Sequence, residues 1–195
     1  MFILLRPRGC DVAFCDVNET HIKDTLEILR GINSSGTFYG AICDVRDGEK
    51  CYSFAKDVLA AFKTDYVNML FNNAGVAPAE LQSIWDTNPN DWNWAYGVNV
   101  MGIVHGLQAF IPDMLSHGKE ANVINTCSGN GAFINLPSTP IYTSSKAAVS
   151  SISEVLKLQL DQSGSNIKVS ILFPGPHTVR TNLFSAERNR PDELA

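Results

Sequence analysis

The sequence predicts an α/β fold, in which a parallel sheet carries helices on both of its faces. Strand-like and helix-like segments alternate along the chain, several of the strand-like segments are short apolar runs, and polar or glycine-containing turns follow them. This alternation is typical of strand–helix–strand units. At 195 residues, with no internal repeat, low-complexity tract or linker, residues 1–195 are expected to form a single domain.

The first half of the chain supplies three expected strands and two helices. The strands are expected at residues 11–16, 37–42 and 66–71. Between the first two, Ile22, Leu26 and Leu29 have helical spacing, and Gly31 is a good terminator. A second helix is expected to begin after Asp47 as its N-cap, with an inner face made by Cys51, Ala55, Val58 and Phe62.

The second half continues the alternation. A loop or short helix is expected over residues 76–90, followed by a long helix that Asp91 caps and that runs toward Leu115. A strand near residues 123–128, a helix opened by Tyr142 and a last strand at residues 167–173 complete the pattern. The polar segment from residue 182 onward is expected to be mobile.

Composition excludes several classes of partner. The formal charge of −5 and the lack of a basic cluster argue against nucleic acid and anionic membranes. Residues 2–5 form too short an apolar run for a signal core or a membrane span. The five cysteines are odd in number and lack Cys-x-x-Cys spacing, which favours free thiols over disulfides or a metal site and predicts a cytoplasmic protein.

Three side chains form a candidate catalytic site. Tyr142 and Lys146 are four residues apart, so they share one face of a helix, and Ser128 leaves the end of a strand. An ammonium about 4 Å from a phenolate stabilises it by up to roughly 4 kcal/mol at an effective dielectric near 20, so we expect the pKa of Tyr142 to fall by up to about three units. Taken alone, a Tyr-x-x-x-Lys pair is more often an ordinary solvated helix face.

The surrounding motifs make the site more specific. Asn72-Asn-Ala-Gly75, Asn99-Val-Met-Gly102, Ser128, Tyr142-x-x-x-Lys146 and Pro174-Gly175 follow in this order. Over roughly residues 9–183, the chain therefore resembles the short-chain dehydrogenases/reductases. The resemblance implies a Rossmann-like, doubly wound parallel sheet and an NAD(P)-dependent oxidoreductase that interconverts a secondary alcohol and a ketone by hydride transfer.

The resemblance also implies a role for each catalytic residue. Tyr142 would be the acid/base, Lys146 its activator and an anchor for the nicotinamide ribose, and Ser128 the residue that orients the substrate. Asn99 would hold a water that relays protons between Lys146 and solvent. An asparagine that kinks its helix and satisfies local backbone groups would serve the same position, and the two roles are compatible.

Further residues would bind the cofactor. Asp16, at the end of the first strand, matches the acidic residue that binds the adenosine ribose. Its carboxylate would repel a 2′-phosphate, so NAD is preferred to NADP; the alternative role of helix cap is better filled by Asn18. The remaining implied cofactor-binding residues are Asp44, Val45, Asn72, Ala74, Gly75, Tyr142, Lys146, Pro174, Gly175, Val179 and Thr181. A loop histidine, His177, is more often incidental than catalytic.

The sequence departs from the family pattern at both ends. The first strand with its Gly-x-x-x-Gly-x-Gly turn and the last strand are missing, and residues 1–9 resemble the end of the first helix instead. Residues 2–5 lie too close to Val12 to supply a parallel strand before it. We therefore expect a truncated family member whose sheet has an unfilled slot or two loosely joined halves.

Two functions follow from these observations. The complete set of catalytic residues favours the oxidoreductase, with a small alcohol or ketone as substrate. The resemblance to the family also implies a homo-oligomer formed through the Asn99 and Tyr142 helices. The missing glycine-rich turn favours a catalytically inactive module that binds or dimerises with a partner. The substrate is not readable, although apolar residues in the loop 129–140 are consistent with an apolar pocket.

Overall fold

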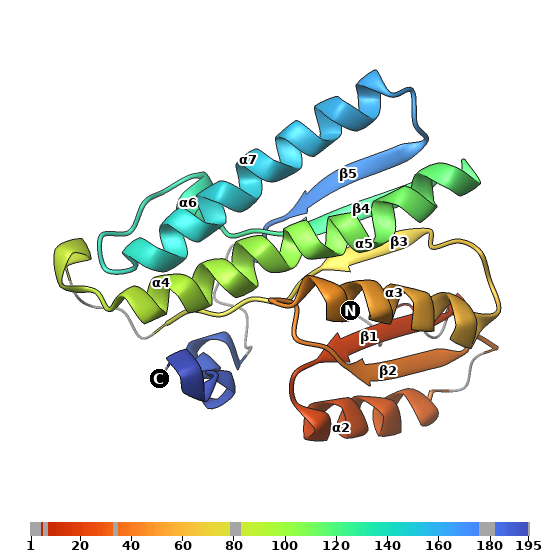
Figure 1. Cartoon of the computed structure of the whole chain (residues 1–195), viewed down its shortest axis with the longest axis horizontal. Coiled ribbons are helices and arrows are strands. Elements are labelled where there is room, and N and C mark those ends of the chain that lie inside the picture. The colour runs from red at the N-terminus through yellow and green to blue at the C-terminus, as the bar shows by residue number, and fades with distance from the viewer. Residues whose placement is uncertain (1–4, 6–7, 33–34, 79–82, 176–181, 195) are drawn as a thin grey trace.

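The computed structural model describes residues 5, 8–32, 35–78, 83–175 and 182–194 (Figure 1). Its elements run in the order β1 (Val12–Asp16), α2 (Glu19–Arg30), β2 (Phe38–Ile42), α3 (Gly48–Phe62), β3 (Met69–Asn72), α4 (Pro89–Tyr96), a π-helical turn (Gly97–Met101), α5 (Gly102–His117), β4 (Ala121–Thr126), α6 (Gly129–Ala132), α7 (Pro140–Gln162) and β5 (Ile167–Leu172). Short 3₁₀ turns cover Ile84–Asp86, Asn182–Asn189 and Asp192–Leu194. The fold is α/β, as predicted. Most of residues 1–9, expected to end a helix, lie outside the described part.

The sheet is parallel throughout and divided into two parts. β1 pairs with β2, while β3, β4 and β5 form a second sheet in that order. In the described part of the chain no ladder joins β1 to β3, which agrees with the expected division at the place of the absent middle strand. The parallel strands still end together within each sheet, because Asp16 lies opposite Ile42, and Thr126 lies opposite Leu172.

Helices cover both faces of the smaller sheet because successive strand residues point in opposite directions. Phe14 packs with Ile22 and Leu29 beneath α2, whereas the next residue, Cys15, faces the core under α3. α3, α5 and α7 lie side by side in one layer (Figure 1). None of the helices in the described ranges combines the length and the apolar character needed to cross a membrane.

One core joins the two sheets. Cys43, which follows β2, packs with Cys51 and Ala55 of α3 in the same cluster as Leu70 of β3 and Val123 of β4. Phe110 and Met114 of α5 fill the space between them. The expectation of loosely joined halves is therefore wrong in one respect: the hydrogen-bonded ladder is divided, but the apolar core is continuous.

The long central helix begins earlier than the sequence predicts. Asn88, not Asp91, is its N-cap, because the Asn88 side chain accepts a hydrogen bond from the Asn90 backbone N–H and Pro89 occupies the first helical position. Proline is favoured there since that position needs no backbone donor. Asp47 and Asn18 cap α3 and α2, as expected.

The polar C-terminal segment is packed rather than free. Ala186 is buried among Val76, Trp94 and Ile141. Arg190 forms an ion pair with Asp91 and lies over the ring of Trp94. The sequence prediction of a mobile segment overlooked Ala186 and Arg190, which hold the segment against α4.

Candidate active site

Ser128, Tyr142 and Lys146 converge at the carboxyl edge of the larger sheet. Ser128 follows β4, and Tyr142 and Lys146 occupy the first two turns of α7. The Ser128 side chain is hydrogen-bonded to the Tyr142 hydroxyl. The Lys146 Nζ lies 5.7 Å from the centroid of the Tyr142 ring. The three polar groups predicted to act together therefore meet in one place.

Lys146 is almost entirely buried, with 3% of its surface exposed. Its Nζ donates a hydrogen bond to the carbonyl oxygen of Thr126 at 3.0 Å. Burial lowers the pKa of Lys146 from 10.5 to about 8, and the neighbouring Cys127 acts in the opposite direction. The site thus holds an ammonium that is ready to lose its proton just above neutral pH.

The electrostatics of Tyr142 differ from the prediction. Its pKa is raised, chiefly because burial disfavours the phenolate, and the hydrogen bond with Ser128 lowers it only in part. In this arrangement the Lys146 ammonium is directed to the Thr126 carbonyl rather than to the phenol oxygen. The expected fall in the pKa of Tyr142 is therefore wrong for the site as it stands, in which Tyr142 holds its proton.

Asn99 is fully buried in the π-helical turn between α4 and α5. Its Oδ1 accepts from the backbone N–H of Val76 at 2.8 Å, and its Nδ2 donates to the Val76 carbonyl and to the Ser145 hydroxyl. π-helical turns concentrate at functional sites. Asn99 thus performs the structural role that its position allows, tying the segment after β3 to α7.

Gly75 lies where these groups face one another. A Cβ at this position would stand 3.4 Å from Asn99 Oδ1 and 3.6 Å from Lys146 Nζ. Glycine therefore leaves a small open space between an amide oxygen and the ammonium. Ala74, beside it, is exposed at the same edge of the sheet.

The side chain of Asn72 points away from that edge. Its Nδ2 donates to Asn125 Oδ1 at 2.9 Å, and Asn125 in turn donates to Ser153 on α7. A Cβ at Gly106 would lie 2.2 Å from Asn72 Oδ1, so α5 needs glycine at its closest approach. Asn72 links β3, β4, α5 and α7, and only its backbone remains for a cofactor.

The loop that carries Ser128 is tied to the start of α7. Asn130 donates to Thr139 at 2.8 Å and accepts from the Thr143 hydroxyl at 2.8 Å. Gly131, at φ +95°, packs against the backbone of α7, where a Cβ would lie 2.3 Å from the Thr143 carbonyl oxygen. These contacts fix the position of Ser128 relative to Tyr142.

A second group of predicted residues lies at the end of the smaller sheet. Asp16 accepts a hydrogen bond from the Asn18 backbone N–H at 2.8 Å, and its side chain remains 39% exposed. Asp44 is engaged by Arg46 through Nε and the terminal nitrogen, and Arg46 also contacts Glu193 of the C-terminal segment. These contacts with Arg46 lower the pKa of Asp44, against the effect of burial.

The other predicted cofactor residues divide into two groups. Val45, Pro174 and Gly175 follow β2 and β5 at the same edges of the sheets as Asp16 and Ser128. Gly175 has a φ of +147°, a backbone conformation that favours glycine. Val179, Thr181 and His177 lie outside the described residues.

Sequence reasoning missed the groups that hold the site in place. The carbonyl of Thr126 fixes Lys146, the backbone of Val76 fixes Asn99, and Asn130 fixes the Ser128 loop. Backbone partners leave no side-chain signal in a sequence. Asn130, two residues after Ser128 in a Ser-Gly-Asn-Gly turn, is the one residue of this set that turn chemistry marks.

Comparison with known proteins supports the predicted fold and family. The family model of the short chain dehydrogenases matches residues 3–192. A CLA biosynthesis dehydrogenase/reductase from Lactiplantibacillus plantarum is 26% identical over 96% of this chain and 63% of its own length. The chain thus spans somewhat less than two thirds of that relative.

Solved structures show the same fold. A short chain dehydrogenase/reductase from Burkholderia phymatum in complex with NAD is 37% identical, with a TM-score of 0.87, and the match covers 95% of this chain and 63% of that one. A metagenomic short-chain oxidoreductase in complex with NADP shares the fold, with a TM-score of 0.77 at 23% identity over 89% of this chain and 74% of that one. Together with the family match over nearly the whole sequence, these likenesses show that the chain belongs to the short-chain dehydrogenase/reductase family of oxidoreductases.

Proposed function

We propose that this chain is an NAD-dependent oxidoreductase that interconverts a secondary alcohol and a ketone, with Tyr142 as the acid/base. The observation that carries the proposal is the buried Lys146 ammonium, held within 5.7 Å of the Tyr142 ring while Ser128 is hydrogen-bonded to the Tyr142 hydroxyl. A buried lysine beside a partly buried tyrosine at the edge of a sheet points to chemistry, because burial disfavours the charged form of the lysine.

Each polar group has a definite task in the proposed reaction. A bound nicotinamide would supply or accept the hydride. In the reducing direction, Ser128 donates a hydrogen bond to the substrate carbonyl oxygen, and Tyr142 gives its proton to that oxygen as negative charge develops there. Because Tyr142 holds its proton in the described site, it begins as the acid. Once its ammonium turns from the Thr126 carbonyl toward the phenolate, Lys146 would stabilise the charge left behind, and Asn99 would hold a water that relays protons to Lys146.

The position and exposure of Asp16 support a bound nucleotide. The exposed Asp16 carboxylate retains acceptor capacity for the hydroxyls of the adenosine ribose. Val45 would contact the adenine, Tyr142 and Lys146 the nicotinamide ribose, and the backbone at Ala74 and Gly75 the rest of the cofactor. Pro174 and Gly175 would lie beside the nicotinamide, and the proposal extends to Val179 and Thr181 beyond the described residues.

NAD is the preferred nucleotide in this proposal. Asp16 would repel a 2′-phosphate, and the nearby Arg46 is engaged by Asp44 and Glu193 rather than available to offset that charge. We expect Asp16→Asn to strengthen NADPH binding relative to NADH by about tenfold, the scale of one removed charge contact at a partly exposed site. Fluorescence titration with both nucleotides measures the ratio, and an unchanged ratio would contradict the assigned role of Asp16.

The whole function can be tested by binding and turnover together. Calorimetry with NAD is followed by an NADH-fluorescence assay over a panel of cyclic and aromatic secondary alcohols and the matching ketones. Micromolar binding of NAD with turnover of at least one pair is the expected result. No binding at millimolar NAD would reject the proposal and favour the inactive binding module.

Self-association is part of the same proposal. α5 and α7 lie side by side (Figure 1), and Leu115 of α5 and Val155 and Leu158 of α7 are exposed. Exposed apolar side chains on adjoining helices support pairing with a second copy through these helices. Sedimentation velocity is expected to show a dimer or larger species that Val155→Glu with Leu158→Glu converts to monomer.

A further inference from the structure

Three of the five cysteines gather at the end of the smaller sheet. Cys15 lies in β1, Cys43 follows β2 directly, and Cys51 lies in the first turn of α3. The Sγ atoms of Cys43 and Cys51 are 4.0 Å apart, and both residues are buried. The sulfur of Cys51 also lies 3.7 Å from the Val45 carbonyl oxygen.

The local fold explains why the thiols meet. Cys15 and Cys43 share the face of the strands that packs under α3, because Ala41 lies opposite Cys15 and Cys43 is two residues further along. The Asp47 cap then turns the chain into α3, which brings Cys51 back over Cys43. The described residues contain no group of three His, Cys, Asp or Glu side chains placed to hold a metal, so this cluster is a set of thiols rather than a metal site.

The thiols are not equivalent. Contacts with the sulfurs of Cys15 and Cys51 lower the pKa of Cys43, although burial and the carboxylates of Asp44 and Asp47 oppose this effect. The same contacts raise the pKa of Cys15 and of Cys51. The thiolate is the reactive form of cysteine, so Cys43 is the nucleophile of the cluster and Cys51 its neighbour.

We propose that Cys43 and Cys51 form a reversible disulfide when the protein meets a peroxide. The Cys43 thiolate attacks one oxygen of hydrogen peroxide, the O–O bond breaks, and the released hydroxide takes up a proton to leave water and a Cys43 sulfenic acid. The Cys51 sulfur then attacks the Cys43 sulfur, the S–O bond breaks, and a second water leaves. Two thiols lose two electrons and two protons, and one peroxide becomes two waters.

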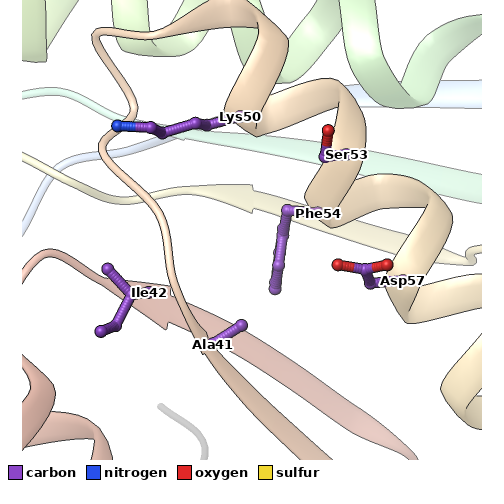
Figure 2. A pocket seen from close by; sticks show the side chains of 6 residues that line it. All are labelled: Ala41, Ile42, Lys50, Ser53, Phe54 and Asp57. Atoms are coloured by element: carbon purple, nitrogen blue, oxygen red, sulfur yellow. The ribbon is translucent and has the colours of Figure 1, made fainter.

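A small hollow lies beside the segments that carry the two thiols. A hollow of about 100 Å³ lies between β2 and α3, lined by Ala41, Ile42, Lys50, Ser53, Phe54 and Asp57 (Figure 2). Ile42 and Lys50 directly precede Cys43 and Cys51 in the chain. The hollow therefore reaches the segments that carry both thiols, although the sulfurs themselves are covered.

The disulfide would change the segment expected to contact adenine. A disulfide is about 2.05 Å long, so the two sulfurs must approach by about half of their present separation. The closed loop contains Asp44, Val45 and Arg46. His105 Nδ1 lies 2.8 Å from the carbonyl oxygen of Val45 and restrains that residue. Part of the backbone movement that accompanies disulfide formation must therefore be taken up by Asp44. This consequence for the cofactor rests on the proposed function, whereas the disulfide itself does not.

Peptide mapping of the peroxide-treated chain tests the disulfide directly. The folded protein is treated with hydrogen peroxide, alkylated with iodoacetamide and digested without reductant. The expected result is a linked pair of peptides carrying Cys43 and Cys51 that dithiothreitol separates. Cys51→Ser should stop the reaction at a Cys43 sulfenic acid that dimedone traps, and Cys10→Ser, outside the cluster, should form the link as the unchanged protein does.

Two outcomes would overturn the proposal. One is that Cys43 and Cys51 are still alkylated after unfolding of the peroxide-treated chain, and the other is that the link joins Cys15 to Cys43. NADH titration then measures the consequence, and we expect about tenfold weaker binding in the oxidised protein, restored by dithiothreitol. Unchanged NADH binding with the link present would overturn the adenine-site consequence alone. Failure of NADH to bind even the reduced protein would count against the proposed function and leave the mapping result intact.

Discussion

The buried charge of Lys146 lowers the folding stability of the chain at a position that the proposed reaction needs. The ammonium has one hydrogen-bond partner shown in the structure, the Thr126 carbonyl, and its pKa falls from 10.5 to about 8. A shift of this kind means that the folded state binds the proton less tightly than the unfolded chain does. Below pH 8 the charge therefore costs folding free energy, and between pH 8 and 10.5 that cost declines as the folded lysine loses its proton first.

Replacing the charge should stabilise the protein while destroying its activity. We expect Lys146→Met to raise the free energy of unfolding at pH 7 by roughly 1–3 kcal/mol, from the size of the pKa shift and the near-isosteric side chain. The gain should shrink toward pH 10. Urea denaturation at both pH values measures it, with the exposed Lys56→Met on α3 as the control. A variant that is less stable than the unchanged chain at pH 7 would contradict this account of Lys146.

At the scale of the elements, the loop between β4 and α7 sets the distance between Ser128 and Tyr142. Asn130 bonds the threonines at the start of α7, and Gly131 permits the loop backbone to touch that helix. The length of this loop and the position of its glycine therefore determine how far Ser128 lies from Tyr142.

Adding a methyl group at Gly131 should disturb the distance between Ser128 and Tyr142. Gly131 combines a φ of +95° with a Cβ position 2.3 Å from the Thr143 carbonyl oxygen, whereas Gly118, at φ +66°, has nothing within 4 Å. We expect Gly131→Ala to cost about 2–4 kcal/mol and Gly118→Ala about 1 kcal/mol, because only the first adds a backbone clash to the strain. Thermal unfolding of both variants provides the comparison. Equal losses of unfolding free energy in the two variants would show that the contact between Gly131 and α7 does not contribute to stability.

The elements also show what could be read from the sequence. Apolar spacing placed α2 and α3 and their inner faces correctly, because helix caps and periodicity are local. The start of the central helix was misplaced by the competition between Asn88 and Asp91 as caps. Ser128, Tyr142 and Lys146 could be grouped from their motif, but the raised pKa of Tyr142 could not be predicted, since it depends on how deeply the folded chain buries the phenol.

At the scale of the whole molecule, the chain combines a divided sheet with an undivided core. The strands β1 and β2 each have one hydrogen-bonded neighbour in the described part of the chain, while β4 has two. The packing of Cys43, Cys51 and Ala55 with Leu70 and Val123 connects the two parts. The sequence predicted the division from the missing strand, but it could not show that side chains would bridge it.

Hydrogen exchange should show the effect of this difference in the number of hydrogen-bonded neighbours of each strand. Backbone amides in β4, which is paired on both sides and includes the fully buried Val123, are expected to exchange most slowly. Amides in β1 and β2 should exchange faster by at least one order of magnitude, because local opening there breaks a single ladder. Mass spectrometry of peptides from each sheet measures both rates. Equal protection would mean that the two sheets open only together.

The account as a whole depends on proton transfer by Tyr142, and turnover by Tyr142→Phe tests this most directly. The substitution removes only the hydroxyl, and Tyr96→Phe, on the neighbouring helix α4, removes the same group away from the site. With the substrate pair found in the activity panel, we expect kcat of Tyr142→Phe to fall by about 10²–10⁴-fold with NADH binding retained, and that of Tyr96→Phe to stay within about twofold. Turnover by Tyr142→Phe at the rate of the unchanged chain would contradict the proposed chemistry.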